Sequence, residues 1–318
     1  LSGIVAGFLS DKYSSRLLFG IFSGLCFMGC LAVAVSSGRI SMLIGLVLLG
    51  LGTGIYHPVG LSAITRNISR RAMGLGIHGM AGSVGMSILP VGAISIGVMF
   101  GWETSFFVGA VLSISVLILL PLIPTEFDRP VDKGNSSLSQ TTKLQGSLLQ
   151  RPLMALYGVA IIRQFSVLGF FTFLTTAIAA YVGFGEERIL GLSATGIFAS
   201  LVIGFGGLGA YIGGRLGERF PSEGVLIAAT LITIPLLVLI GFVKGVFLLV
   251  LITITSMAFQ AAEPQVGVII GRLLPSNMHG KGFALLYGLA QLIGSIAGIV
   301  AGAVAQHYGV NWVFPVSG

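Results

Sequence analysis

Long runs of apolar residues without any charge occupy most of this chain of 318 residues. A run of about 18 or more such residues can span the hydrocarbon core of a bilayer as a helix. The runs are continuous, whereas the strands of a membrane barrel alternate in polarity over about ten residues. The sequence therefore predicts an all-α integral membrane protein.

About ten spans follow from the positions of these runs. The full spans are expected at about 17–37, 40–65, 72–100, 104–124, 152–182, 189–214, 224–243, 245–271 and 282–306. Shorter apolar segments at 1–10 and 310–318 are interpreted as parts of two further spans. Because both termini fall in apolar segments, we expect the chain to be a fragment of a longer protein.

The composition excludes an ordinary soluble domain. Only 8% of the residues are charged, whereas a soluble domain carries about 25% charged residues. The 48 glycines fit membrane helices, in which small residues let backbones approach closely. The net charge of +7 is distributed over the loops, so it indicates membrane topology rather than a nucleic-acid partner.

The positive charges lie mainly on one side of the predicted membrane. Alternate loops form two sets, and thirteen of the seventeen Lys and Arg residues fall in the first set. Arg39, Arg188 and Lys244 fall in the second set, and Arg163 lies inside a span. Because cytoplasmic loops carry the excess of basic residues, the first set is expected to be cytoplasmic, together with the polar stretch 125–151. The expected localisation is a prokaryotic plasma membrane, with many passes through the bilayer.

The sequence repeats itself with a displacement of 206 or 207 residues. The matching positions are Gly7 and Gly214, Asp11 and Glu218, Lys12 and Arg219, His57-Pro58 and Glu263-Pro264, and Gly74-x-Gly76 and Gly280-x-Gly282. Two halves with one helix plan, 1–124 and 152–318, are therefore predicted, joined by a linker at 125–151. Internal repeats of this kind are typical of secondary transporters.

A spaced pattern of glycine, acid and base follows the first partial span. Its members are Gly7, Asp11, Lys12 and Arg16, with Ser14 and Ser15 before the last. The pattern resembles the major facilitator superfamily signature G-x-x-x-D-[RK]-x-G-[RK]-[RK]. Where that signature has a glycine and then a basic residue, this chain has Ser14 and Ser15. Gly214, Glu218 and Arg219 form a degenerate second copy.

The resemblance implies twelve helices in a six-plus-six bundle. This chain would then lack helix 1 and most of helix 12. Helices 2–6 would lie in 1–124, and helices 7–11 with the start of helix 12 would lie in 152–318. A small-molecule solute and the lipid bilayer are the partners that follow, and we expect a monomer.

Asp11 and Glu218 are expected at cytoplasmic ends of helices. A carboxylate there can meet a helix N-terminus or a nearby Arg, with a gain of about 0.3–1 kcal/mol when exposed. Such contacts would close the inner face and break when it opens; plain topogenic charge is the alternative. The gate motif defined in this way comprises Gly7, Asp11, Lys12, Arg16, Gly214, Glu218 and Arg219.

Three ionisable residues, Arg163, Glu263 and His57, lie at similar depth inside predicted spans. Charges in the hydrocarbon are costly and usually face a cavity or a partner. In the superfamily their helices line a central cavity, so the resemblance makes them candidates for substrate binding and proton coupling. We expect Arg163 and Glu263 to face each other or a shared substrate. A structural ion pair, and a packing role for His57, are the alternatives.

These residues favour a secondary active transporter that moves a small organic solute by alternating access, with protons as the coupling ion. His57-Pro58 and the general pattern look like bacterial drug and antibiotic exporters of the fosmidomycin-resistance kind, so efflux is favoured. The alternatives are an importer of an organic anion bound by Arg163 and, in another class, a non-transporting receptor or scaffold. The sequence shows no paired carboxylates, metal-ligand cluster or nucleophile with a base. An enzyme, a cofactor and a metal are therefore not expected.

Overall fold

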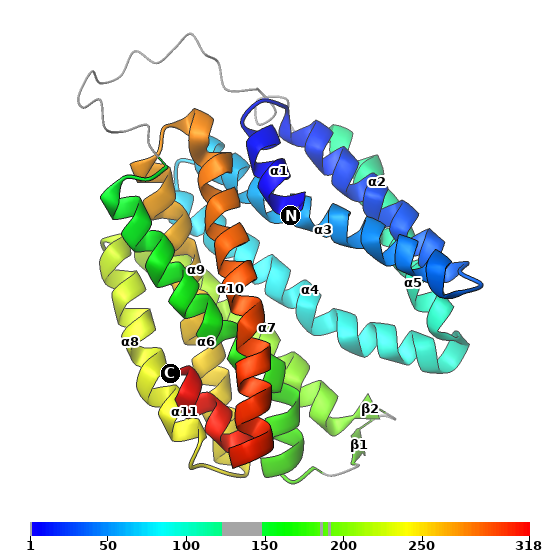
Figure 1. Cartoon of the computed structure of the whole chain (residues 1–318), viewed down its shortest axis with the longest axis vertical. Coiled ribbons are helices and arrows are strands. Elements are labelled where there is room, and N and C mark those ends of the chain that lie inside the picture. Colours follow the sequence, from blue (N-terminus) through cyan, green and yellow to red (C-terminus); the bar gives the residue numbers. More distant parts are fainter. Residues whose placement is uncertain (1, 123–147, 185–186, 190–191) are drawn as a thin grey trace. The chain divides into compact units, whose positions relative to one another are not determined.

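The structure, a computed structural model, describes residues 2–122, 148–184, 187–189 and 192–318. Most of the predicted linker, 125–151, lies outside these described residues. The described chain is almost entirely helical (Figure 1) and includes a short antiparallel ribbon of β1 (Arg188–Ile189) and β2 (Leu192–Ser193).

The helices form two series, one on each side of the linker. The first series is α1 (Ser2–Ser10), α2 (Ser15–Ala34), α3 (Arg39–Asn67), α4 (Arg71–Phe100) and α5 (Trp102–Leu119). The second is α6 (Arg151–Tyr181), α7 (Ala194–Gly217), α8 (Ser222–Ile240), α9 (Val246–Leu273), α10 (His279–Tyr308) and α11 (Val313–Ser317). In the described part of the chain, nine helices are long and apolar enough to cross a membrane. The predicted all-α membrane fold is thereby confirmed.

The helix boundaries agree with the predicted spans to within a few residues, with one correction. The span expected at 189–214 begins later, because β1 and β2 occupy its start and α7 begins only at Ala194. The Ser193 side chain caps α7 and accepts a hydrogen bond from the Gly196 N–H at 3.4 Å. The apolar residues of the ribbon continue the apolar run of α7 in the sequence, so the sequence alone did not indicate where α7 begins.

Ser14, which stands where the superfamily signature has glycine, caps α2. Its backbone is extended, with φ −64° and ψ 144°, and its Oγ accepts a hydrogen bond from the Leu17 N–H at 3.1 Å. A side-chain cap of this type stabilises a helix by about 1 kcal/mol. The departure from the signature therefore fixes the start of α2.

The chain divides into two compact units, each with segments from both sequence halves. Unit 1 comprises Leu1–Ser69, Ala93–Met154 and Ile270–Gly288, and unit 2 comprises Arg70–Gly92, Ala155–Ile269 and Leu289–Gly318. The start of α10 thus belongs to unit 1, and the start of α4 belongs to unit 2. The predicted halves, 1–124 and 152–318, describe the repeat in the sequence. Their assignment as two domains stays a prediction.

Each unit has its own apolar core. In unit 2, the Phe170 ring of α6 lies edge-on to Phe259 and Phe314, with centroids 5.5 and 6.0 Å away. All three rings are at most 2% exposed. A smaller core in unit 1 joins α1, α2 and α3 through Ala6, Leu18, Ile55 and Val59.

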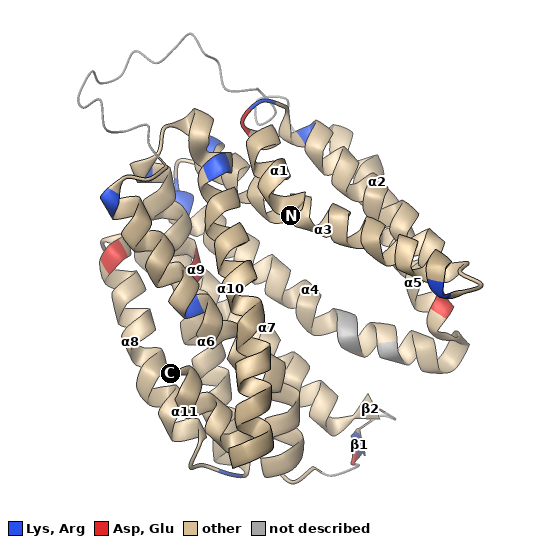
Figure 2. Ribbon diagram, in the orientation of Figure 1, with Lys and Arg blue, Asp and Glu red and all other residues tan. Residues whose placement is uncertain are grey.

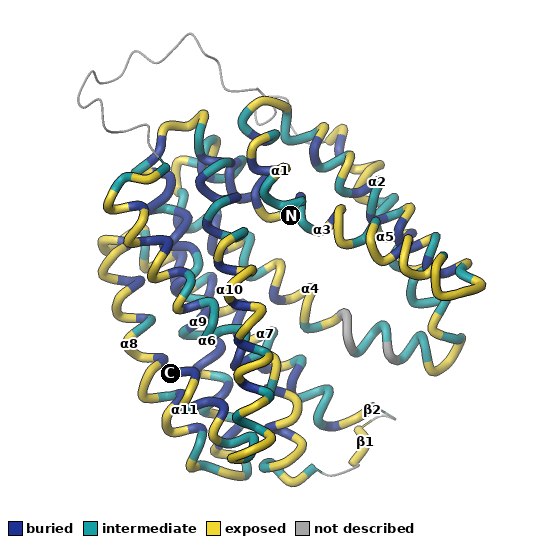
Figure 3. Tube along the Cα trace, viewed as in Figure 1, coloured by how far each residue is buried: buried dark blue, intermediate teal, exposed yellow. Residues whose placement is uncertain are grey.

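Exposed residues occur along the spans, not only at their ends (Figure 3), and many of them are large and apolar. Examples are Leu43 at 60%, Leu231 at 59% and Ile299 at 74% exposure. The charged residues lie mainly at helix ends and in loops (Figure 2). Hydrocarbon, and not water, is the solvent that such helix surfaces match, as expected for a multi-pass membrane protein.

Candidate functional site

Arg163 and Glu263 form an ion pair within unit 2. Arg163 Nη2 donates to Glu263 Oε1, and Arg163 Nη1 donates to the Phe259 carbonyl oxygen at 2.9 Å. Arg163 lies twelve residues into α6 and Glu263 ten residues before the end of α9, which is roughly 15–18 Å along each helix. The structure thus pairs these two residues, whereas their roles in substrate binding and proton coupling stay a prediction.

The two partners of the pair differ in exposure. The Arg163 side chain is 6% exposed and the Glu263 side chain is 31% exposed. A buried charge without a partner costs several kcal/mol, so the carboxylate and the Phe259 carbonyl are what allow Arg163 to be buried. Glu263 is the more exposed member of the pair.

Gln260 extends this polar site and was not predicted from the sequence. It lies one helical turn before Glu263, and its Nε2 donates to Ser83 Oγ of α4 at 3.1 Å. Ser83 is 3% exposed and Gln260 is half-buried, so this hydrogen bond joins α9 to α4 in a partly buried contact. The spacing of three residues from Glu263, which places both on one helix face, was the available signal. A neutral amide stands out less than a charge in an apolar run.

His57 occupies the equivalent place in unit 1. It lies on α3, ten residues before the helix end and directly before Pro58, as Glu263 lies on α9 before Pro264. The imidazole is exposed and stacks on Tyr287 of α10, with centroids 5.9 Å and planes 16° apart. The structure thus brings Arg163 together with Glu263, and His57 together with aromatic side chains of its own unit.

Asp11 directly follows α1 and contacts the N-terminus of α10. Its Oδ1 accepts the Gly280 N–H at 2.8 Å, and its Oδ2 accepts the Lys281 N–H at 3.1 Å. Arg66 Nη1 lies 3.4 Å from Asp11 Oδ1, and the two side chains are 11% and 2% exposed. A helix N-terminus with an Arg is the arrangement expected for the gate motif. We call this set of residues the first-half clamp.

The first-half clamp removes its carboxylate from water. Burial raises the pKa of the Asp11 carboxyl above its ordinary value of 3.8. This effect exceeds the opposing ones of the two backbone N–H groups and of the Arg66 and Lys281 charges. The clamp therefore favours the ionised carboxyl less than its hydrogen bonds alone suggest.

Glu218 directly follows α7 and repeats this arrangement within unit 2. Its Oε1 accepts the N–H of Met73, in the first turn of α4, at 3.1 Å. Its Oε2 lies 3.7 Å from Arg70 Nε, and the side chains of Glu218 and Arg70 are 22% and 67% exposed. This second-half clamp has the same plan as the first and is more open to solvent. The equivalence predicted from the repeat is thereby confirmed at these two positions.

The glycines of the gate motif lie where helices cross. A Cβ atom at Gly7 would overlap the carbonyl oxygen of Gly280, and one at Gly214 would lie 2.6 Å from the carbonyl oxygen of Ala72. Each glycine therefore lets a helix that ends at a clamp approach the helix whose N-terminus the clamp holds.

The remaining gate residues lie around the clamps. Lys12 and Arg219 are exposed in the turns after α1 and α7. Arg16 is half-buried in the first turn of α2. None of these three supplies a clamp contact described above.

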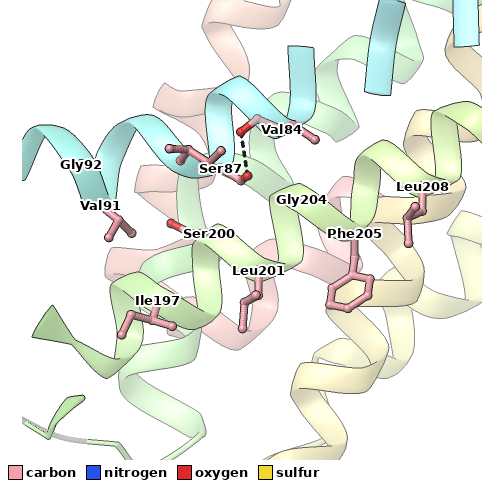
Figure 4. Close-up of a pocket in the computed structure, with 11 residues that line it drawn as sticks. Val84, Ser87, Val91, Gly92, Ile197, Ser200, Leu201, Gly204, Phe205 and Leu208 are labelled. Atoms are coloured by element: carbon pink, nitrogen blue, oxygen red, sulfur yellow. Dashed lines mark hydrogen bonds between the residues drawn. The ribbon is translucent and has the colours of Figure 1, made fainter. Parts of the chain in front are cut away.

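A separate pocket of about 610 Å³ lies between α4 and α7 in unit 2 (Figure 4). Leu201, Phe205 and other apolar side chains form most of its wall, and Ser87 Oγ donates to the Val84 carbonyl at 2.8 Å. Its lining includes no titratable side chain. The pocket is therefore distinct from the site built around Arg163 and Glu263.

The sequence profile of the Major Facilitator Superfamily matches residues 1–246. The chain belongs to this superfamily. The matched region includes Asp11, Glu218 and Arg163, while Glu263 lies beyond it.

Curated relatives include bacterial members of the superfamily. The MFS-type transporter Rv1250 of Mycobacterium tuberculosis is 33% identical over 134 residues, which are 39% of this chain and 23% of that protein. The fosmidomycin resistance protein of Escherichia coli is 25% identical over 327 residues, which are 98% of this chain and 76% of that protein. The chain thus matches less than a quarter of the first relative's length and about three quarters of the second's.

Solved structures of other superfamily members share the fold. The human organic anion transporter MFSD10 is 16% identical with a TM-score of 0.78, and the match covers 99% of this chain and 77% of that one. The Escherichia coli fucose:proton symporter FucP is 17% identical with a TM-score of 0.75, covering 100% of this chain and 84% of that one. At these identities the likeness shows the fold alone.

Proposed function

We propose that the protein is a secondary active transporter that exports a small organic solute in exchange for protons, by alternating access. The Arg163–Glu263 pair in the middle of two membrane spans carries this proposal. Charges at such depth are expensive and usually mark a substrate or proton pathway. A non-transporting receptor or scaffold has no functional need of a charge pair at this depth.

Coupling follows from the protonation of Glu263. When Glu263 is ionised, it neutralises Arg163. When Glu263 takes a proton, the pair loses one charge and Arg163 keeps an uncompensated positive charge. Any solute that binds the ionised form and the protonated form with different affinity is therefore linked to the proton.

The direction of transport depends on how the solute uses the pair. If the solute and the proton compete for Glu263, their fluxes are opposed, and an inward proton gradient drives efflux. If protonation frees Arg163 for an anionic solute, the two move together, and the same gradient drives import. The exposure of Glu263 at 31% against 6% for Arg163 favours competition at Glu263. The name of the relative that confers fosmidomycin resistance also favours efflux.

The two clamps supply the conformational part of the proposal. Alternating access requires contacts at one face that hold and then release. The clamps of Asp11 and Glu218 join helix ends to helix N-termini at equivalent places, through a few hydrogen bonds and one Arg each. We assign them to the closed state of the cytoplasmic face.

Proton movement in everted membrane vesicles tests this proposal. Vesicles that contain the full chain are energised so that their interior is acidic, and a pH-sensitive dye reports internal protons. Adding fosmidomycin, or members of an antibiotic and metabolite panel, should release protons from the vesicles if exchange occurs. Solute-dependent proton entry would support the importer instead. No proton movement with any solute, in vesicles that contain folded protein, would contradict both forms of coupling.

A further inference from the structure

Two apolar pockets lie next to each other along α7 in unit 2. The larger, the α4–α7 pocket described above, has a volume of about 610 Å³, and a smaller one of about 310 Å³ is lined by α7 and α9. Leu201 and Phe205 line both pockets, and Figure 4 shows their side chains on the same side of α7. We call these two residues the ridge. The two pockets are therefore separated by one row of side chains.

The α4–α7 pocket forms because two helices that touch at one place are further apart at another. A Cβ atom at Gly207 of α7 would lie 3.1 Å from the carbonyl oxygen of Met80 on α4. Small residues allow such a close approach of helix backbones. About three turns further along α4, a Cβ atom at Gly92 would meet no described atom within 4 Å. The pocket occupies the space that opens between these two places.

The walls of both pockets offer apolar contacts. Among the described residues that line them, none carries a titratable side chain. The Ser87 hydroxyl donates to the Val84 carbonyl oxygen at 2.8 Å, and the Thr253 hydroxyl donates to the Leu249 carbonyl oxygen at 2.7 Å. These hydroxyls thus direct their hydrogen atoms to their own helices. Sites for small solutes usually place a few polar groups toward the ligand, so these walls suit a long apolar chain better.

Both pockets open onto a surface that hydrocarbon covers. Ile88 of α4 is 64% exposed, and Leu201 and Phe205 of α7 are 48% and 45% exposed. These residues lie within two of the candidate membrane spans. Large apolar side chains at such positions face lipid chains in a bilayer. A membrane lipid therefore reaches the pockets directly from its own leaflet.

The extent of the pockets fits one leaflet. The part of α7 that lines the larger pocket runs from Ile197 to Leu208, which is roughly 16 Å along the helix axis. One leaflet supplies about half of a hydrocarbon core roughly 30 Å thick. The α9 wall of the smaller pocket, 249–254, lies near the start of α9 as the α7 wall lies near the start of α7. Because spans two apart run in the same direction, both pockets lie in the same leaflet.

A basic residue lies near the end of the pockets that is closest to the start of α7. Arg188 of β1 pairs with Ser193 of β2, the residue that caps α7. Ile197 of the α4–α7 pocket follows Ser193 by about one helical turn. Arg188 is exposed, and a guanidinium group is well suited to bind phosphate. A phosphate group at the membrane surface therefore lies within its range.

We propose that one diacyl phospholipid binds to this face, with one acyl chain in each pocket, the ridge between the chains, and its phosphate toward Arg188. The two pockets share Leu201 and Phe205, so chains that occupy them are close enough to belong to one glycerol backbone. This lipid is a bound ligand of unit 2 and exchanges more slowly than the lipids around it. The inference does not depend on which solute the protein moves or on how transport is coupled.

Native mass spectrometry of the full chain in mild detergent, titrated with palmitoyl-oleoyl phosphatidylethanolamine, tests this site. Gly92→Leu places a side chain in the open part of the α4–α7 pocket, where it displaces about four lipid atoms and should weaken binding roughly five- to tenfold. Leucine also favours helix more than glycine does, so the variant should fold. Gly82→Leu is the matched control on the same helix. A Cβ atom at Gly82 also meets no described atom within 4 Å, and Gly82 does not line the pocket, so binding should not change.

Three further comparisons test the two chains and the phosphate separately. Phe205→Ala removes a wall that both pockets share and should weaken binding roughly five- to tenfold. Lysophosphatidylethanolamine, which has one chain, should bind wild-type protein at least about tenfold more weakly than the diacyl lipid. Arg188→Gln should weaken diacyl lipid binding by up to about fivefold, as expected for an exposed charge contact. Arg39→Gln, at the exposed first residue of α3, is its control and should bind as wild type does.

Several results would overturn the site. They are Gly92→Leu and Phe205→Ala binding the diacyl lipid as well as wild type, or Gly82→Leu losing as much as Gly92→Leu. Equal affinity for the one-chain lipid would show that a single lipid does not use both pockets. Rhodamine 6G, a lipophilic solute, bound by wild type and lost in Gly92→Leu while the phospholipid stays bound would assign the larger pocket to a solute. A dimer that Gly92→Leu disrupts would assign this face to a second copy of the chain. The unfolding midpoint of each variant shows whether it is folded.

Discussion

Asp11 and Glu218 hold equivalent places in the two sequence halves, since each directly follows a helix and accepts a backbone N–H from the first turn of a helix of the other half. The Asp11 side chain is 2% exposed, whereas that of Glu218 is 22% exposed. Water competes less for the contacts of the first-half clamp. The two clamps are therefore the same in plan and differ in how far water reaches their contacts.

Neutralising the two clamp acids should impair transport to different degrees. Asp11→Asn removes the charge that faces Arg66 and the α10 N-terminus, so the closed state loses its buried contact. Glu218→Gln removes a contact with the 67% exposed Arg70, which is worth about 0–1 kcal/mol. Initial transport rates at equal membrane expression should fall more for Asp11→Asn. If both variants transport at the wild-type initial rate, the two acids do not act in a gate and contribute only to the orientation of the chain in the membrane.

The raised pKa of the Asp11 carboxyl predicts a different result for stability. The folded state favours the protonated form, so this contribution is present below the ordinary pKa of 3.8 and is lost as the pH rises through the folded-state pKa. At pH 7 the charge of Asp11 therefore adds no net stability. Asp11→Asn should therefore change the unfolding midpoint at pH 7 only slightly, because it removes the desolvated charge together with one of the two acceptors of the Gly280 and Lys281 N–H groups. A clear fall in that midpoint would show that the ionised clamp stabilises the fold.

Close helix packing at one glycine gives a test of the second-half bundle. A Cβ atom at Gly213 of α7 would overlap the carbonyl oxygen of Ala261 on α9, whereas one at Gly298 of α10 would meet nothing within 4 Å. Gly213→Ala should therefore destabilise the protein by about 1–3 kcal/mol. Gly298→Ala is the control and should cost nothing. Thermal unfolding in detergent measures both, and equal midpoints would contradict the packing of α7 on α9.

Cysteine labelling tests the predicted orientation. Ser69 lies between α3 and α4 and Glu187 lies before α7, and both are exposed, while the native Cys26 and Cys30 are buried. In intact cells a membrane-impermeant maleimide should react with the Glu187→Cys variant and not with the Ser69→Cys variant. Labelling of Ser69→Cys alone would reverse the orientation inferred from the basic residues.

The sequence predicted the fold and the charged contacts because charge is rare here. Apolar runs marked the spans, and the repeat displacement related Asp11 to Glu218 before their partners were known. Only one Arg and one Glu lay deep in the spans of the second half, so their pairing followed from the cost of burying each alone.

The contacts that the sequence did not predict involve residues that are ordinary in membrane helices. Gln260 and Tyr287 carry no charge, so nothing in the apolar pattern distinguishes them. Their partners, Ser83 and His57, lie far away in the chain, and only the packing of helices brings them into contact. The ribbon at β1 and β2 was missed for a similar reason, because its apolar residues continue the run that becomes α7.

The stability of the Arg163–Glu263 pair separates a structural role from a coupling role. Glu263→Leu leaves the 6% exposed Arg163 without its counter-charge, which should cost about 3–5 kcal/mol. Adding Arg163→Met should restore most of this loss, because both buried charges are then gone. Chemical unfolding of the two variants measures the difference. Full recovery of stability together with full recovery of transport would make the pair structural only.

Gradient-driven transport by Glu263→Gln tests the central claim most directly. The amide oxygen can still accept a hydrogen bond from Arg163, so the site keeps its shape while losing its titratable group. The measurement compares solute accumulation under an imposed pH gradient with solute exchange at equal pH, in liposomes that contain wild-type or variant protein. Proton coupling at Glu263 predicts that the variant loses accumulation and retains exchange. Accumulation at the wild-type level would contradict it.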